Sequence, residues 1–228
     1  MLRTRQRTTE PPAGLPAWFF WDYDRAEVIA DAVVHASGMV AAITGAVLLL
    51  SAGLPTGVAG DRAPILVYAI GLVTALGLSA IYNLWPVSPV KWILRRFDQS
   101  AIYLFIAATY TPFLPRITTG FSTVGWLSFI WLFALAGSAL RLFWPGRLER
   151  VAVALCCLLG WSGVVLIGRL QWPTMGLLLL GGLLYSTGIT FHFWDRLRFQ
   201  NAIWHLFVLL AAAAHYFAVL MSVGLQLA

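Results

Sequence analysis

Charged residues are scarce in this sequence. Only 11% of the 228 residues are Asp, Glu, Lys or Arg, whereas soluble domains carry about 25%. Hydrophobic residues make up 60%, and the mean hydropathy is +0.81. A soluble fold of this length could not bury so many apolar side chains, so the composition excludes a soluble enzyme, a disordered chain and, with only two cysteines, a disulfide-rich secreted domain. A polytopic membrane protein remains.

The gaps between charged residues predict the architecture. Residues 32–60, 63–90, 99–115, 117–140, 151–168, 170–194 and 199–228 contain no Asp, Glu, Lys or Arg. Each stretch is long enough for a bilayer-spanning helix, which needs about 17 to 25 apolar residues. A membrane β-barrel would show alternating polarity, and runs such as Leu177–Leu180 do not alternate. We therefore predict an all-α bundle of seven transmembrane helices, near residues 28–52, 64–85, 98–115, 120–140, 150–168, 172–192 and 200–225.

Basic residues are unevenly distributed between the two ends of these helices. One side carries Arg3, Arg5, Arg7, Arg25, Lys91, Arg95, Arg96, Arg141, Arg147, Arg150, Arg196 and Arg198, and the other only Arg62, Arg116 and Arg169. By the positive-inside rule, the N-terminus is cytoplasmic and the C-terminus lies outside. The net charge of +6 therefore reflects topology in the cell (inner) membrane and contact with membrane lipids, and no nucleic-acid partner is predicted.

The chain divides into two parts by composition. Residues 1–27 form a polar, proline-containing cytoplasmic tail followed by an aromatic segment that suits the membrane interface. Residues 28–228 form the membrane domain. The adjacent Cys156 and Cys157 lie mid-helix and are interpreted as packing residues, neither a disulfide nor a metal site. Gly71 on the second helix and Gly181, Gly182 and Gly188 on the sixth are expected at close helix contacts.

Polar side chains within spanning helices are costly unless they are paired or hydrated, and each is a candidate functional group. The candidates are Asp31, His35, Ser79, Asn83, Asp98, Asn201 and His205. At 1.5 Å rise per residue, all of them fall near the cytoplasmic ends of the first, second, third and seventh helices. They are therefore expected to form one polar layer. His215 lies roughly 15 Å further along the last helix and is interpreted as a hydrogen-bonded helix-contact residue.

Four segments carry a resemblance to a known family. They are EVIADAVVH (27–35), SAIYN (79–83), RRFDQSAIYLFIAATYTPF (95–113) and NAIWHLFVLLAAAAHY (201–216). The sequence resembles the hemolysin III family, the bacterial branch of the progestin and adipoQ receptor superfamily. The resemblance implies a seven-helix bundle with the N-terminus inside and a role linked to membrane-lipid homeostasis.

The resemblance also implies a zinc site, from which this sequence departs. Zinc-bearing members use three histidines, one in an S-x-x-x-H motif and two in an H-x-x-x-H motif that begins the seventh helix. Here these positions are Asn83, Asn201 and His205. Neutral amides are poor zinc donors, so the two asparagines are expected to weaken or abolish binding. Ser79 and Asp98, which complete the polar site in the family, are retained.

Several interpretations stay open at this point. The polar residues could form a hydrogen-bonded cluster in which Ser79, Asn83 and Asn201 donate to Asp98 and His205 pairs with it. No cofactor is firmly predicted, although a zinc site of His35, Asp98 and His205 is conceivable. The favoured function is a non-enzymatic membrane protein of hemolysin III type with a degenerate metal site. One alternative is a zinc-dependent lipid amide hydrolase resembling a ceramidase, with Asp98 as general base and Ser79 assisting. A pore or proton-coupled carrier is the other.

Overall fold

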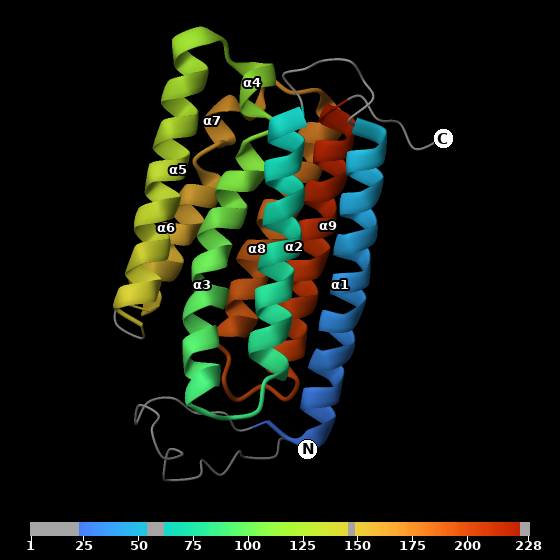
Figure 1. Ribbon diagram of the computed structural model, residues 1–228, viewed down its shortest axis with the longest axis vertical. Coiled ribbons are helices and arrows are strands. Elements are labelled where there is room, and N and C mark those ends of the chain that lie inside the picture. Colours follow the sequence, from blue (N-terminus) through green and yellow to red (C-terminus); the bar gives the residue numbers. More distant parts are fainter. Residues whose placement is uncertain (1–22, 54–61, 146–148, 224–228) are drawn as a thin grey trace.

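Seven long helices run side by side along one axis of the molecule. The computed structural model describes residues 23–53, 62–145 and 149–223. Its long helices are α1 (Arg25–Gly53), α2 (Arg62–Leu84), α3 (Pro89–Tyr110), α5 (Gly120–Phe143), α6 (Glu149–Trp161), α8 (Trp172–His192) and α9 (Gln200–Ser222). Two single-turn segments, α4 (Leu114–Ile117) and α7 (Val164–Ile167), lie near the end opposite the start of α1 (Figure 1). The predicted all-α seven-helix bundle is confirmed.

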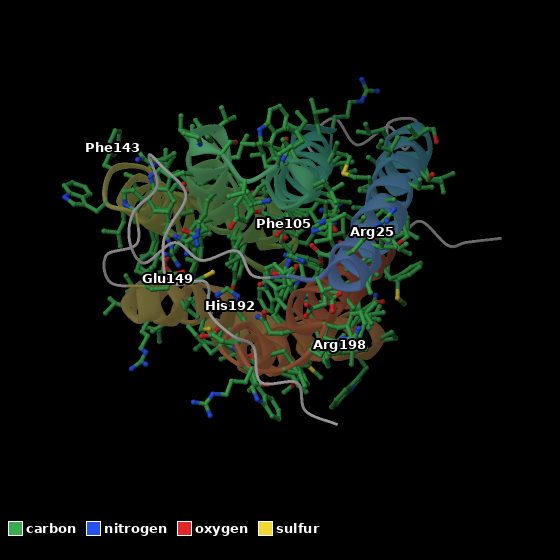
Figure 2. The ribbon with its side chains drawn as sticks, turned by 90° about the horizontal axis from the view of Figure 1, so that it is seen from below. Arg25, Phe105, Phe143, Glu149, His192 and Arg198 are labelled. Atoms are coloured by element: carbon green, nitrogen blue, oxygen red, sulfur yellow. The ribbon has the colours of Figure 1, made fainter. Side chains whose placement is uncertain are left out.

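The helices form a ring when they are viewed along the bundle axis (Figure 2). Sequence neighbours α1, α2 and α3 pack in order, α3 packs on α5, and α5 on α6. The α8–α9 hairpin closes the ring, because α9 packs against α1. We call the end at which α1, α3, α6 and α9 begin the N-terminal end. This arrangement brings α1 next to α9 although the two are far apart in sequence.

Five of the described helices are long and apolar enough to cross a bilayer, namely α1, α2, α5, α8 and α9. The other two long helices deviate for separate reasons. Helix α3 begins at Pro89, nine residues before the predicted start, and so includes Lys91, Arg95 and Arg96. Its start is set by Ser88, whose hydroxyl accepts from the Lys91 N–H, with Pro89 at the first helical position. The charge-free window failed to predict this start because a helix can extend beyond the hydrocarbon region.

The predicted fifth helix, 150–168, is interrupted between α6 and α7. The Ser162 N–H bonds to the carbonyl of Leu159, three residues back, and the Gly163 N–H leaves the helical ladder. The Tyr110 hydroxyl of α3 enters this break, where it accepts from Gly163 N at 2.7 Å and donates to Gly160 O at 2.7 Å. A side chain from a neighbouring helix thus satisfies the backbone groups that the break exposes, as buried backbone requires in a membrane.

Removing this hydroxyl is expected to destabilise the protein. Tyr110→Phe leaves the Gly163 N–H unpaired, at a cost of about 1–3 kcal/mol, which lowers the midpoint of unfolding in detergent. Tyr68→Phe is the matched control, because the buried Tyr68 hydroxyl has no hydrogen-bond partner among the described residues. The control should leave the midpoint unchanged or raise it. Equal midpoints for the two variants would contradict the assigned role of Tyr110.

A side chain that caps the start of α1 also accepts a hydrogen bond from the residue before α9. Asp24 and Glu27 form a reciprocal capping box, in which the Glu27 N–H donates to Asp24 and the Asp24 N–H donates to Glu27, both at 2.9 Å. The hydrogen bond from the Glu27 N–H lowers the pKa of Asp24. Glu27 Oε1 also accepts from the Phe199 N–H at 2.9 Å, and Phe199 has a left-handed backbone (φ 61°) just before α9. The capping residues of α1 therefore fix where α9 begins.

Close helix contacts occur at the glycines that the sequence singled out. A Cβ at Gly71 would lie 2.6 Å from the Ala108 Cβ, and one at Gly188 would lie 2.9 Å from Phe207. Gly181 makes room for the ring of His215, whose Nε2 lies 3.3 Å from Leu178 O. The interpretation of His215 as a hydrogen-bonded helix-contact residue is confirmed.

Candidate functional site

The polar residues on α1, α2, α3 and α9 lie together at the N-terminal end of the bundle. Asp31 and His35 come from the second and third turns of α1, and Ser79 and Asn83 from the last turns of α2. Asp98 comes from α3, and Asn201 and His205 come from the first turns of α9. The hydrogen bonds described below link members of this set across α1, α2 and α9.

Asp31 accepts the strongest of these hydrogen bonds. Its Oδ2 accepts from Asn201 Nδ2 at 2.9 Å, and its Oδ1 lies 2.6 Å from His205 Nδ1. Because an ionised carboxylate can only accept, His205 donates through Nδ1–H, which leaves Nε2 as the lone-pair nitrogen. Asp31 and His205 are both buried. The carboxylate therefore fixes the tautomer and orientation of the imidazole.

His35 faces the same carboxylate but is not hydrogen-bonded to it. It lies four residues after Asp31, on the same face of α1. Its Nε2 is 3.5 Å from Asp31 Oδ2, and its ring centroid lies 4.4 Å from that of His205. The Nε2 atom is buried and has no hydrogen-bond partner among the described residues. Asp31, His35 and His205 together place three potential ligand atoms within 4.8 Å of one another.

The two asparagines pair with each other. Asn201 Nδ2 donates to Asn83 Oδ1 at 3.2 Å, so this amide oxygen is already in use. Asn83 Nδ2 lies 2.9 Å from Ser79 O, 3.4 Å from the Ser79 hydroxyl and 3.4 Å from His205 Nε2. A weakly basic amide oxygen that already accepts a hydrogen bond is a poor zinc ligand. The positions that the family resemblance implies, Asn83, Asn201 and His205, therefore fit zinc poorly as a set.

Asp98 differs from its expected role as the centre of the cluster. Ser79 is its hydrogen-bonding neighbour, and the positive charge of Arg95 acts on it. Asn201 and His205, which were expected to bond Asp98, bond Asp31 instead. The reason is lateral packing, since α9 lies against α1. The metal-ligand set that the structure brings together likewise contains Asp31 where Asp98 was considered.

A cavity of about 580 Å³ extends through the bundle from this polar layer. Ser79, Asp98 and His205 line it at the N-terminal end. Towards the other end its walls are mostly apolar and include Phe105, Ile106, Leu114, Leu170 and Leu178. The volume lies within the usual range for small-molecule sites, about 300–1,000 Å³. The polar layer is therefore accessible from an apolar chamber inside the bundle.

A second polar cluster at the same end was missed by the sequence analysis. Glu149 at the start of α6 accepts from Arg141 at 3.0 Å, from Arg95 at 3.4 Å and from Gln99 at 3.2 Å. It thereby ties α6 to α5 and α3, and its side chain lines the cavity. Arginines at helix ends were interpreted only as topological determinants. The sequence contains one indication of this cluster, because Glu149 is the single acidic residue among the basic residues between the predicted fourth and fifth helices.

The two cysteines and one further histidine also lie along the cavity. Cys156 and Cys157 are free thiols on α6, consistent with packing residues, and both line the cavity. His192, labelled in Figure 2, lies at the end of α8 and also lines the cavity. Its ring centroid lies 5.2 Å from that of Trp204. The tail and most of the aromatic segment assigned to residues 1–27 lie outside the described residues.

Comparison with known proteins identifies the family. The sequence profile described as "Haemolysin-III related" matches residues 26–216, which include every candidate site residue named above. The chain belongs to the haemolysin-III related family. It is 34% identical to "Hemolysin-3" of Bacillus cereus over 203 residues, covering 86% of this chain and 92% of that protein. It is 33% identical to the "Hemolysin-3 homolog" of Bacillus subtilis (strain 168), covering 85% and 93%.

The similarity extends to mammals. The human "Monocyte to macrophage differentiation factor" is 32% identical over 203 residues, covering 85% of this chain and 83% of that protein. The family profile, which matches residues 26–216, includes the residues of the polar layer. This haemolysin-III related chain is thus a multi-pass membrane protein whose polar layer and cavity lie within the part shared with its relatives.

Proposed function

We propose that this haemolysin-III related protein binds a membrane lipid inside its helix bundle and acts in membrane-lipid homeostasis. The observation that carries the proposal is the cavity of about 580 Å³, which has polar groups at one end and apolar walls along the rest. A lipid has the same division between a polar headgroup region and hydrocarbon. Each buried CH₂ group of an acyl chain contributes about 0.8 kcal/mol, so a chain in the apolar chamber provides most of the binding energy.

The polar layer supplies recognition of the headgroup region. The Ser79 hydroxyl, the Asp98 carboxylate and the lone-pair nitrogen of His205 present both acceptors and a donor. An amide or hydroxyl group next to an acyl chain complements this set, because it offers donors to the carboxylate and an acceptor to the hydroxyl. A lipid of this type would span the polar layer and the chamber together.

Filling the chamber should expel the lipid. Val153 of α6 lines the cavity, whereas Val151 on the same helix faces outwards with 48% of its surface exposed. Val153→Trp is expected to reduce the lipid that co-purifies with the protein by about tenfold, the loss that corresponds to roughly 1.4 kcal/mol. Val151→Trp, with the same added bulk on the lipid-facing side, should retain it.

Lipid content is measured by extraction of purified protein and mass spectrometry, normalised to protein. Loss of lipid from both variants would indicate general damage to the bundle. Equal retention by both, with wild-type unfolding midpoints, would contradict the cavity as the lipid site.

A second candidate is a lipid amide hydrolase, which the position of Asp98 beside Ser79 at the cavity end favours. In this function Asp98 would take a proton from a water molecule whose oxygen adds to the carbonyl carbon of the lipid amide, and would return that proton to the nitrogen as the C–N bond breaks. Ser79 would orient the carboxylate. A divalent metal near His205, when bound, would polarise the carbonyl. Release of fatty acid from a short-chain ceramide by wild type, with loss in Asp98→Asn, supports this function. No release with added zinc counts against it. The apolar chamber walls do not favour a pore.

We infer that the N-terminal end of the bundle faces the cytoplasm. In the described part of the chain, Arg25, Lys91, Arg95, Arg96, Arg141, Arg150, Arg196 and Arg198 lie at that end, and Arg62, Arg116 and Arg169 lie at the other. A periplasm-active reporter fused after Ala228 should be active, and a cytoplasm-active reporter at the same position should be silent. The reverse pattern would overturn the orientation.

A further inference from the structure

Three side chains that can bind a metal ion lie close together in the polar layer, and neither Asn83 nor Asn201 is among them. Asp31, His35 and His205 are 4%, 6% and 7% exposed, and their ligand atoms lie within 4.8 Å of one another. Among the described residues this is the one group of three or more His, Cys, Asp or Glu side chains with this arrangement. Two of its members come from α1, a helix that contributes nothing to the ligand set implied by the family resemblance.

The unpaired nitrogen of His35 points to a ligand. Its Nε2 atom is buried and finds no hydrogen-bond partner within residues 23–53, 62–145 and 149–223, and a carboxylate oxygen of Asp31 lies 3.5 Å away. Leaving a buried polar atom unpaired costs about 1–3 kcal/mol, and native proteins rarely accept this cost without a reason. A cation between His35 and Asp31 would use the free nitrogen lone pair and the carboxylate charge together.

The spacing suits a tetrahedral metal ion. With metal–ligand bonds of about 2.0–2.1 Å, the ligand atoms of a tetrahedral zinc site lie about 3.3 Å apart. The distance from His35 Nε2 to Asp31 Oδ2 is 3.5 Å, and that from His205 Nδ1 to Asp31 Oδ1 is 2.6 Å. To bind through Nδ1, the neutral imidazole of His205 would carry its proton on Nε2 instead, because a ligating nitrogen must be deprotonated. Two imidazoles and one carboxylate are among the common ligand sets of catalytic zinc sites. Small side-chain adjustments would therefore suffice for binding.

The surroundings support the same assignment. Asn201 donates to Asp31 Oδ2, which is the outer-sphere hydrogen bond that orients a ligating carboxylate. His205 lines the cavity, so the site has a route to it from inside the bundle. A divalent ion would also offset the negative charge of the buried Asp31 carboxylate.

We propose that Asp31, His35 and His205 form a binding site for a divalent transition-metal ion with the ligand preferences of zinc. In this site His205 occupies a ligand position implied by the family resemblance, and Asp31 and His35 take the roles that Asn83 and Asn201 cannot fill. Asn201 acts instead as a hydrogen-bonding partner of Asp31. The proposal does not depend on lipid binding, since it concerns the metal content of the protein alone.

Metal analysis of the purified full-length protein tests this site. Protein in detergent is stripped with chelator, loaded with ZnCl₂ and desalted, and its metal is measured by mass spectrometry. Wild type should retain about one ion per chain, and Co²⁺ loading should give the visible absorption bands of a tetrahedral site. His35→Ala and Asp31→Asn should each lose this ion, and Asn201→Ala should weaken its binding about tenfold or more.

Two controls decide between ligand sets. Asn83→Ala tests the family position on α2, and His192→Ala removes a cavity-lining histidine outside the cluster; both should keep the ion. Retention of zinc by His35→Ala but not by Asn83→Ala would overturn the proposal in favour of the family's positions. A wild-type protein that elutes as a folded species but holds no stoichiometric zinc or cobalt after loading would also overturn it. If a variant fails to fold, the cobalt spectrum of the wild-type protein still tests whether a tetrahedral metal site is present.

Discussion

Asp31→Leu is expected to lower the free energy of unfolding by about 3–5 kcal/mol, the largest effect of any substitution in the polar layer. Asp31 accepts from Asn201 and His205, and both donors are left unpaired inside the bundle when the carboxylate is replaced by a branched alkyl group. Detergent-induced unfolding in mixed micelles, with chelator present so that metal does not contribute, measures the change.

Asp31→Asn is the matched control for this prediction. The amide keeps the shape of the side chain and one acceptor oxygen for His205, but it removes the charge. Its loss of stability in chelator should be clearly smaller than that of the leucine variant. A leucine variant within about 1 kcal/mol of wild type would show that α1 and α9 are held together by other contacts, such as the Tyr216 hydroxyl on Gly45 O.

Lys91→Met is expected to produce the second large effect. The Lys91 side chain is fully buried, and its ammonium group donates to the carbonyls of Tyr82, Asn83 and Trp85 at 2.8, 2.9 and 2.7 Å. It therefore satisfies the carbonyl groups that the end of α2 leaves without helical partners. Methionine fills the same space but cannot donate. The expected loss is about 3 kcal/mol or more, because hydrogen bonds to charged groups contribute about 1.5–3 kcal/mol each.

Arg169→Met provides the comparison for Lys91. Arg169 donates to a single carbonyl, Ile117 O at 3.2 Å, in an exposed position at the opposite end of the bundle. Its replacement should change the free energy of unfolding by less than about 0.5 kcal/mol. Both variants remove one positive charge, so a difference between them reports on the buried carbonyl contacts. Equal effects would contradict the capping role of Lys91.

Lys91 also connects stability to the candidate site. Its ammonium group donates to the backbone carbonyls of Asn83 and of the preceding residue, Tyr82, and its charge acts on Asp31. Loss of Lys91 is therefore expected to loosen the end of α2 from which Asn83 reaches His205. From its place in the sequence, Lys91 was expected only to add to the cytoplasmic charge excess, since a lysine just beyond an apolar stretch most often lies in the headgroup region.

Properties of single helices could be predicted from the sequence, whereas contacts between helices could not. The amino-acid sequence by itself determined the number of long helices, their apolar length and the level at which Asp31, His35, Asn83, Asp98, Asn201 and His205 lie, because charge-free length and 1.5 Å rise per residue act along one helix at a time. It also indicated which residues share a face, as with Asp31 and His35.

Only the tertiary structure decided which helices are neighbours, and hence which polar groups meet. Because α9 packs against α1, His205 forms a hydrogen bond with Asp31, whereas the hydrogen-bonding neighbour of Asp98 is Ser79. The packing of α3 against α6 placed Tyr110 in the break at Gly163. Spacing along a chain carries no information on lateral order around a ring of helices. That order follows from how closely the helices fit together, as where Ala108 packs on Gly71 and His215 on Gly181, summed over the whole bundle.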